Sequence, residues 1–216
     1  MKPEYGSVPR QERFMSPSLK RELDYLVCGP DSAPPRAIVI YMHGAGGKVE
    51  QGMSVDNYGG AFGRLRQLAK QRRYLYVCAE ADGFRAEAGR NLIELTSLLA
   101  GSYPGIPVYI AGASAGGRAV VHSIVEGARG YAGIVLICPG VDRDVYADRN
   151  MSLRVPVYVS HGIQDGVVPV ANVDQYVEYL KRQGVSVTYD RITGDHDAPL
   201  IRMDWHKALE TVGCRS

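Results

Sequence analysis

Residues 108–117 read VYIAGASAGG, and the fold prediction rests mainly on this segment. Pro107–Ala111 is an apolar run typical of a buried strand, and a helical pattern extends from Ala115 to about Gly127. Between them, Gly112-Ala113-Ser114-Ala115-Gly116 matches the pattern G-x-S-x-G. A serine on a sharp strand–turn–helix junction needs small neighbours, and every neighbour here is glycine or alanine. We therefore expect the Ser114 hydroxyl to be exposed near a helix N-terminus, as a nucleophile requires.

Apolar strands and amphipathic helices alternate on both sides of this segment. Further strands are expected at Glu22–Cys28, Ala37–Met42, Tyr74–Ala79, Gly133–Cys138, Val155–Ser160 and Val185–Asp190. Apolar residues recur at helical spacing between these strands, and a last helix is expected over Ile201–Val212, opened by Pro199. The alternation predicts an α/β fold with a mainly parallel central sheet of about seven strands and helices on both faces. In such sheets, functional side chains gather at the carboxyl ends of the strands.

The 216 residues suit a single domain, which we place at residues 19–216. Residues 1–18 are polar and contain several prolines, so we expect them to form a loosely ordered lead-in. The 25 basic and 23 acidic residues nearly balance, and no basic stripe is interleaved with aromatic residues. The composition therefore argues against a nucleic-acid partner.

The four cysteines include no C-x-x-C pair, so neither a zinc site nor a thioredoxin-type site is predicted. Cys28, Cys78 and Cys138 lie in apolar runs, which is typical of buried thiols in a reducing compartment. The N-terminal stretch MKPEYGSVPRQERF has no apolar core of the kind found in signal peptides, and the longest apolar runs of the sequence are far too short for a membrane span. We expect a cytoplasmic protein with no membrane partner, although a chain from which a signal peptide had been removed would give the same sequence.

A second glycine-rich loop, His43-Gly44-Ala45-Gly46-Gly47, follows the strand Ala37–Met42. Acyl transfer needs two backbone N–H groups that stabilise the negatively charged oxygen of the intermediate. We expect one from Ala115, directly after Ser114, and the other from Ala45, with Gly44 or Gly46 as alternatives. Glycines on both sides of Ala45 would let the backbone of this supporting loop approach the substrate closely.

The general base must be a histidine that follows Ser114 and lies on a loop beyond a strand. His196 meets this condition, because it lies between the last predicted strand and the last predicted helix. His122 and His206 fall inside predicted helices, and His161 directly ends a strand, where we expect a structural role.

The acid that orients this histidine should follow the preceding strand. Asp165 lies in the turn after Val155–Ser160. Asp142 and Asp144 compete for this role one strand earlier, but their neighbourhood is too charged to bury a lone carboxylate easily. The predicted catalytic triad is therefore Ser114, His196 and Asp165.

Four motifs in order now resemble the small carboxylesterase branch of the α/β-hydrolases: H-G-x-G-G at 43–47, G-x-S-x-G-G at 112–117, H-G-x-x-D-x-x-V-P at 161–169, and the late His196. That branch includes acyl-protein thioesterases, lysophospholipase-like carboxylesterases, dienelactone hydrolase and polyhydroxybutyrate-depolymerase-type esterases. The resemblance covers about residues 20–212. It departs from dienelactone hydrolase, which has cysteine where this chain has Ser114, and from acyl-protein thioesterases, which usually have glutamine where this chain has Ala115. The resemblance implies an α/β-hydrolase fold and a hydrolase of esters that needs no cofactor and no metal.

Three functions stay open after this step. The one we favour is a carboxylesterase that acts on a small, soluble ester. The alternatives are a hydrolase of another acyl bond, either a thioesterase or a small serine peptidase, and a non-catalytic binding protein of the same fold. Residues 139–154 are too few and too charged to form an apolar lid, which predicts an open cleft and short acyl groups. The acyl group, the alcohol group and the oligomeric state are not predicted by the sequence.

Overall fold

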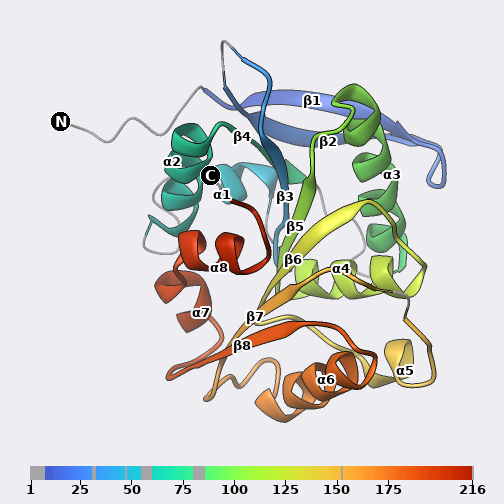
Figure 1. Ribbon diagram of the computed structural model, residues 1–216, viewed down its shortest axis with the longest axis vertical. Coiled ribbons are helices and arrows are strands. Elements are labelled where there is room, and N and C mark those ends of the chain that lie inside the picture. The colour runs from blue at the N-terminus through green and yellow to red at the C-terminus, as the bar shows by residue number, and fades with distance from the viewer. Residues whose placement is uncertain are drawn as a thin grey trace.

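The computed structural model describes residues 8–30, 33–46, 48–54, 60–79, 86–151 and 153–215. Within these ranges, eight strands form one sheet in the order β1-β2-β4-β3-β5-β6-β7-β8 (Figure 1). The strands are β1 (Arg10–Ser16), β2 (Arg21–Cys28), β3 (Ala37–Met42), β4 (Tyr74–Ala79), β5 (Val108–Ala113), β6 (Tyr131–Ile137), β7 (Val157–Gly162) and β8 (Val187–Ile192). β1 pairs with β2 and β2 with β4 in antiparallel fashion, and all other neighbours are parallel. The predicted α/β fold with a mainly parallel sheet is confirmed.

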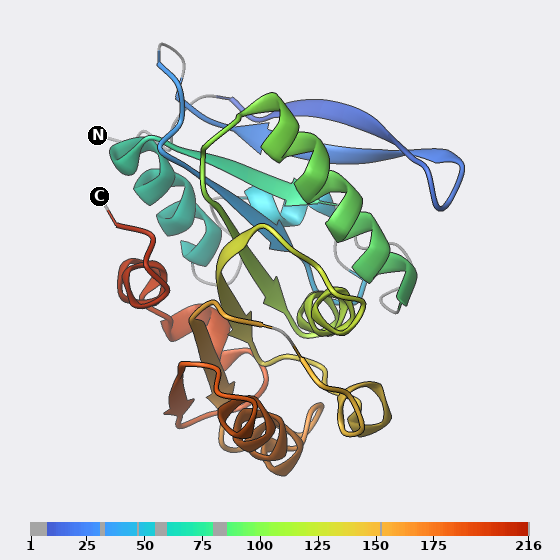
Figure 2. The same ribbon diagram turned by 45° about the vertical axis from the view of Figure 1, so that its right-hand side comes forward.

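Helices cover both faces of the sheet (Figures 1 and 2). One face is covered by α3 (Ala86–Ser102), α4 (Ala115–Val125), the short α5 (Arg143–Tyr146) and α6 (Val170–Arg182). The other face is covered by α1 (Val49–Met53), α2 (Ala61–Arg72), α7 (Ala198–Arg202) and α8 (Trp205–Thr211). None of the helices in the described part of the chain combines the length and the apolar character that a membrane span needs.

The two-sided covering explains why the central strands are apolar throughout. Successive side chains of a strand point to opposite faces. In β3, Ile38, Ile40 and Met42 join the core under α3, α4 and α6, whereas Val39 and Tyr41 join the core under α2 and α8. Both sets are buried, so the strand has no polar face.

The expectation of a loosely ordered lead-in over residues 1–18 is not met at Arg10–Ser16, which form β1. Phe14 and Ser16 are buried on one side of this edge strand, and the Phe14 ring lies 6.2 Å from that of Tyr25. The Ser16 hydroxyl donates a hydrogen bond of 2.6 Å to Glu94 of α3. Charged residues on the exposed side are common in edge strands, and here they conceal the alternating pattern. The domain predicted to begin at residue 19 therefore has its first strand before that boundary, while residues 1–7 lie outside the described residues.

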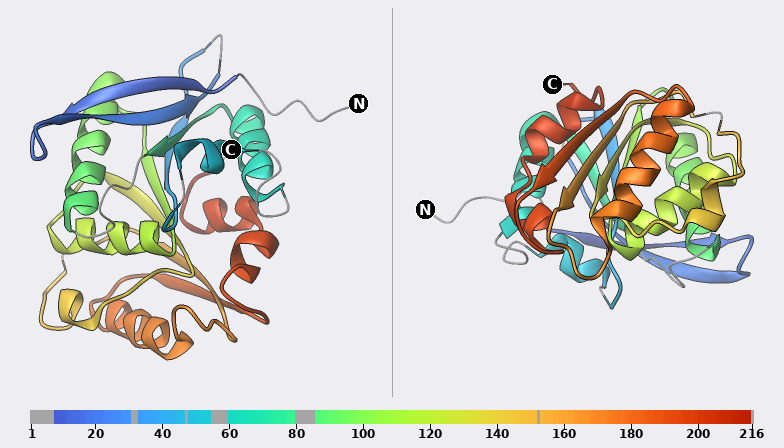
Figure 3. Two further views of the ribbon diagram at one scale, coloured as in Figure 1. Left: turned by 180° about the vertical axis from the view of Figure 1, so that it is seen from behind. Right: turned by 90° about the horizontal axis from the view of Figure 1, so that it is seen from below.

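The single helix expected over Ile201–Val212 is also wrong, because the chain forms two helices there, α7 and α8. Met203 adopts an extended conformation between them. The Asp204 carboxylate then accepts hydrogen bonds from the backbone N–H groups of His206 and Lys207. An aspartate in this position begins a new helix, and its capping bonds compete successfully with continuation of the old one. Figure 3 shows the two helices as separate segments at the C-terminal end of the chain.

Candidate active site

Ser114 lies at the junction of β5 and α4. Its backbone angles, φ 52° and ψ −116°, are ones that residues other than glycine rarely adopt. Its N–H donates to Ile137 O at 2.9 Å, and its carbonyl accepts from Gly140 N at 2.8 Å. These bonds hold the strained residue between two elements of the fold. Strain that the surrounding structure enforces is typical of functional positions.

The glycines on either side of Ser114 are required by close packing. A Cβ atom on Gly112 would lie 2.7 Å from the carbonyl oxygen of Gly116, and one on Gly116 would lie 2.1 Å from that of Met42. The first turn of α4 therefore rests directly against the carboxyl end of β3. This contact brings the predicted oxyanion loop next to the serine.

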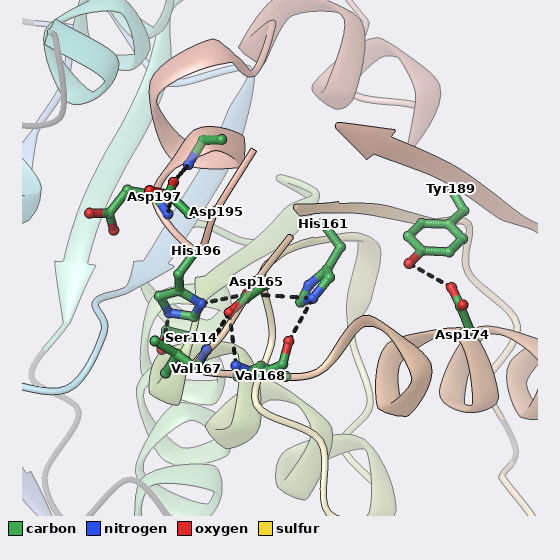
Figure 4. Close-up of polar contacts among 11 residues, drawn as sticks. Ser114, His161, Asp165, Val167, Val168, Asp174, Tyr189, Asp195, His196 and Asp197 are labelled. Carbon is green, nitrogen blue, oxygen red and sulfur yellow. Dashed lines mark hydrogen bonds and ion pairs between the residues drawn. The ribbon is translucent and has the colours of Figure 1, made fainter. Parts of the chain in front are cut away.

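Ser114, His196 and Asp165 are joined by two hydrogen bonds (Figure 4). His196 Nε2 lies 2.9 Å from Ser114 Oγ, and His196 Nδ1 lies 2.6 Å from Asp165 Oδ2. The three residues follow β5, β8 and β7, so loops at the carboxyl ends of three parallel strands bring them together. An ionised carboxylate only accepts hydrogen bonds, so Nδ1 carries the imidazole proton and Nε2 accepts from the serine hydroxyl.

The Asp165 side chain has no exposure to solvent. Burial by itself raises the pKa of this carboxyl, but hydrogen bonds from Val168 N–H, His196 and Val167 N–H outweigh burial and bring the pKa below its ordinary value. The two backbone bonds, both 2.8 Å, go to Oδ1 and leave Oδ2 directed at His196. The arrangement thus holds an ionised carboxylate behind the imidazole.

The loop after β3 lies beside the serine. A Cβ atom on Gly44 would be 3.4 Å from Ser114 Cβ, and Gly44, Ala45 and Gly46 line the same cavity as Ser114. The buried His43 ring contacts the Gly44 carbonyl at 2.9 Å through Nδ1, which fixes the start of the loop. Gly47, which we predicted to support the loop, lies outside the described residues. The use of Ala45 and Ala115 N–H groups as oxyanion donors stays a prediction.

A cavity of about 380 Å³ opens in front of Ser114 and His196. Its inner wall is apolar and includes Tyr41, Phe62 and Leu200, with the Tyr41 and Phe62 rings 4.8 Å apart. The exposed residues Val167 and Asp197 stand at its rim. The site can therefore hold a compact group with an apolar part next to the serine hydroxyl.

The competing residues lie in other surroundings. The Asp142 carboxylate pairs with Arg118 Nε at 3.0 Å on the surface. His206 is about half exposed and lies 3.3 Å from Glu210. His122 is on α4, where the sequence placed it.

His161, for which we predicted a structural role, lies beside the Asp165 carboxylate, a contact that the sequence reasoning did not predict. We expected the strand to end at Ser160, but β7 continues through Gly162, so the imidazole is buried inside the sheet. It lies 3.4 Å from the Asp165 carboxylate and 3.0 Å from the Val168 carbonyl. The feature of the sequence that could have indicated this contact is the place of His161 in the H-G-x-x-D motif, four residues before Asp165.

Comparison with known proteins finds no matching family model and no matching curated protein. Solved structures do match. A thermostable esterase superposes with a TM-score of 0.71 at 20% identity, over 94% of this chain and 61% of the esterase. FphF, a fluorophosphonate-binding serine hydrolase of Staphylococcus aureus, superposes with a TM-score of 0.71 at 13% identity, over 96% of this chain and 99% of FphF. The acylaminoacyl peptidase of Pyrococcus horikoshii superposes with a TM-score of 0.65 at 15% identity over 90% of this chain, and the match spans only 39% of that protein. At these identities the likeness is one of fold.

Proposed function

We propose that this chain, which has the α/β-hydrolase fold, is a serine hydrolase that cleaves carboxylic esters of small substrates. The observation that carries the proposal is the hydrogen-bonded series Ser114–His196–Asp165 beside the cavity. Its geometry meets the two requirements for an activated serine: a base within hydrogen-bond distance of the hydroxyl, and a third group that orients the base. A non-catalytic binding protein would have no need of all three groups in this arrangement.

In the proposed reaction, Ser114 Oγ attacks the ester carbonyl carbon while His196 Nε2 takes the hydroxyl proton. Asp165 keeps the imidazole in the required tautomer and stabilises the imidazolium. The imidazolium then gives its proton to the leaving alcohol, and an acyl-enzyme remains on Ser114. Water, activated by the same histidine, releases the acid and restores the serine.

The negative charge of each tetrahedral intermediate would fall on an oxygen between the loop after β3 and the start of α4. We propose the N–H groups of Ala45 and Ala115 as its donors. Donors fixed before the reaction stabilise this charge without reorganisation, and loss of one donor costs about 10²–10³-fold in kcat in comparable sites. The tight packing of Gly116 against Met42 supports this placement, because it fixes the two segments relative to each other.

The substrate is proposed to be small because nothing in the described part of residues 139–154 extends over the cavity. Four apolar residues of this segment are buried in the core under α4 and α6, and a fifth, Val145, is partly buried against the same core; the four are Val141, Tyr146, Met151 and Leu153. They leave no apolar face that could close over a long acyl chain. The same mechanism would serve thioesters and peptide bonds, so the bond that is cleaved needs a direct test.

The proposal is tested with a fluorophosphonate probe and three matched series of substrates: oxygen esters, thioesters and anilides. Wild type is expected to label covalently and to prefer oxygen esters. Ser114→Ala should lose labelling and most of kcat, up to ~10⁶-fold. Ser97→Ala is the matched control, because Ser97 is an exposed serine on α3 whose hydroxyl, among the described residues, donates within its own helix to Ile93 O. Labelling of Ser114→Ala at the wild-type level would overturn the proposal, and a preference for thioesters or anilides would overturn the ester assignment alone.

A further inference from the structure

His161 places a buried imidazole on the far side of Asp165 from the catalytic histidine (Figure 4). Neither side chain of the His161–Asp165 pair has any exposure to solvent. His161 Nε2 lies 3.0 Å from the carbonyl oxygen of Val168 and 3.4 Å from Asp165 Oδ2. The carboxylate therefore stands between two imidazoles.

The contact with Val168 assigns the tautomer of His161. A carbonyl oxygen only accepts hydrogen bonds, so Nε2 must carry the proton. Nδ1 is then an acceptor, and it has no hydrogen-bond partner among the described residues. Protonation would create an N–H at Nδ1 that is buried and unpartnered, which is costly. Among the described residues, three titratable groups from different segments act electrostatically on this ring: Asp165, His196, and Asp174 of α6. Asp174 is itself held by Tyr189 at 2.9 Å and by Arg191 at 3.7 Å.

We propose that neutral His161 is a positioning residue for the triad, acting on His196 through Val168 and Asp165. This inference rests on the proposed function. The Nε2–H group fixes the Val168 peptide, and the N–H of that same residue holds Asp165 Oδ1 at 2.8 Å. The turn that carries the carboxylate is thereby tied to β7 through the side chain as well as through the main chain.

The second part of the effect is electrostatic. The N–H edge of the imidazole lies near Oδ2, the oxygen that bonds His196. A nearby N–H dipole stabilises negative charge on that oxygen and so limits how strongly the carboxylate favours the imidazolium form of the base. Removal of this N–H should make the base easier to protonate.

The test uses three substitutions that differ in one property each. In His161→Gln the amide nitrogen is separated from Cα by the same number of bonds as Nε2, so a donor stays in place. His161→Asn carries the same amide, but it reaches only as far as Nδ1. His161→Leu has no donor at all. The readouts are kcat and KM on a short ester, the pH profile of kcat/KM, and the midpoint of thermal unfolding.

His161→Gln is expected to stay close to wild type. In His161→Asn and His161→Leu, kcat should fall roughly tenfold with little change in KM, because His161 does not line the cavity. The acidic limb of kcat/KM, which reports protonation of the base in the free enzyme, should move to higher pH by roughly half a unit. A merely structural role predicts lower thermal midpoints with an unmoved acidic limb, and Gln no better than Asn. That result would overturn the inference.

A measurement on wild type tests the tautomer and the neutral charge on which the inference depends, even if the Asn and Leu variants fail to fold. The ¹⁵N resonances of His161 should show a proton on Nε2 and no titration across the acidic limb. A proton on Nδ1, or titration of His161 together with activity, would overturn the inference. Failure of the proposed function looks different, because wild type would then neither hydrolyse esters nor take the fluorophosphonate probe, whatever the tautomer of His161.

Discussion

Asp165 is a buried carboxylate that keeps its charge because it accepts hydrogen bonds from Val167 N–H, Val168 N–H and His196. Asp165→Asn would replace the acceptor Oδ2 with either an amide oxygen or an amide nitrogen. The nitrogen would donate to His196 Nδ1 and favour the tautomer with a proton on Nε2, which cannot take the proton of Ser114. We expect kcat to fall about 10⁴-fold, as for the corresponding change in serine proteases.

The matched control for that change is Asp142→Asn, which alters the surface pair with Arg118 and should leave kcat close to wild type. Single-turnover kinetics on a short ester measures both variants. If Asp142→Asn proves the more damaging substitution, the acid of the triad follows β6 and the assignment of Asp165 is wrong.

The burial of His161 also predicts how the free energy of unfolding depends on pH. Burial lowers the pKa of this histidine below its ordinary value of about 6.5. The unfolded chain therefore binds a proton that the folded chain does not bind, and the free energy of unfolding falls as the pH drops below about 6.5. The loss continues until the pH reaches the folded-state pKa and then levels off. His161→Gln removes the titrating group, so its stability should depend less on pH in this window.

Urea unfolding of wild type and His161→Gln at about pH 7.5 and about pH 5.5 measures this difference. Asp165 contributes equally in both proteins, and its lowered pKa acts mainly below this window. An identical fall in stability for both proteins would contradict the prediction.

At the scale of the element, the junction of β5 and α4 depends on the absence of side chains. Gly116→Ala would place a methyl group 2.1 Å from the Met42 carbonyl oxygen and 2.5 Å from that of His43, closer than these atoms can approach. Because both neighbours are main-chain atoms, α4 would have to move away from β3. We expect a loss of roughly 3 kcal/mol or more in unfolding free energy, together with loss of fluorophosphonate labelling.

Gly101→Ala is the control in the same kind of element. Gly101 lies in the last turn of α3, and a Cβ atom there would meet nothing within 4 Å. This change should be neutral or stabilise the protein by up to about 1 kcal/mol, because alanine favours the helix. Thermal unfolding and probe labelling of the two variants together separate crowding at the junction from a general effect of alanine.

Strands that are apolar along their whole length could be predicted from the sequence. Burial on both faces gives them a continuous run of apolar residues, which no exposed polar residue interrupts. β3, β4 and β5 belong to this group. The carboxyl-end rule then selected the residues that meet in the structure, Ser114, Asp165 and His196. β1 escaped prediction because an edge strand shows only two buried side chains, and the break between α7 and α8 depends on one capping aspartate. The contact of His161 with Asp165, on which the proposed positioning role rests, could not be predicted because only the folded chain places the ring behind the carboxylate.

At the scale of the whole molecule, the proposed function makes the size of the cavity a limit on the size of the substrate. About 380 Å³ is available, and the apolar residues of the segment after β6 are used in the core. Each CH₂ group of an acyl chain that stays outside the cavity forfeits ~0.8 kcal/mol of binding. The value of kcat/KM should therefore stop rising beyond short acyl chains, and activity should not increase when the substrate forms micelles.

A series of p-nitrophenyl esters of increasing acyl length, assayed below and above the micellar threshold, measures both effects. The Phe62→Ala variant is assayed alongside wild type. The smaller side chain enlarges the cavity at its inner wall, so the acyl length that gives the highest kcat/KM should become longer. A steady rise in wild type through long acyl chains, or a jump at the threshold, would show that some other surface binds the chain.

Under the proposed function, the position of β8 has a consequence for how activity is lost. β8 is an edge strand that pairs, among the described strands, with β7 only, and its side chains are mostly half-buried. His196 follows directly after it, whereas Ser114 follows β5 near the middle of the sheet. Edge segments with little buried surface open locally before the whole domain unfolds. Under mild denaturation the base should thus detach from a nucleophile that is still in place, so that catalysis fails in a molecule whose spectroscopic signal is still nearly native.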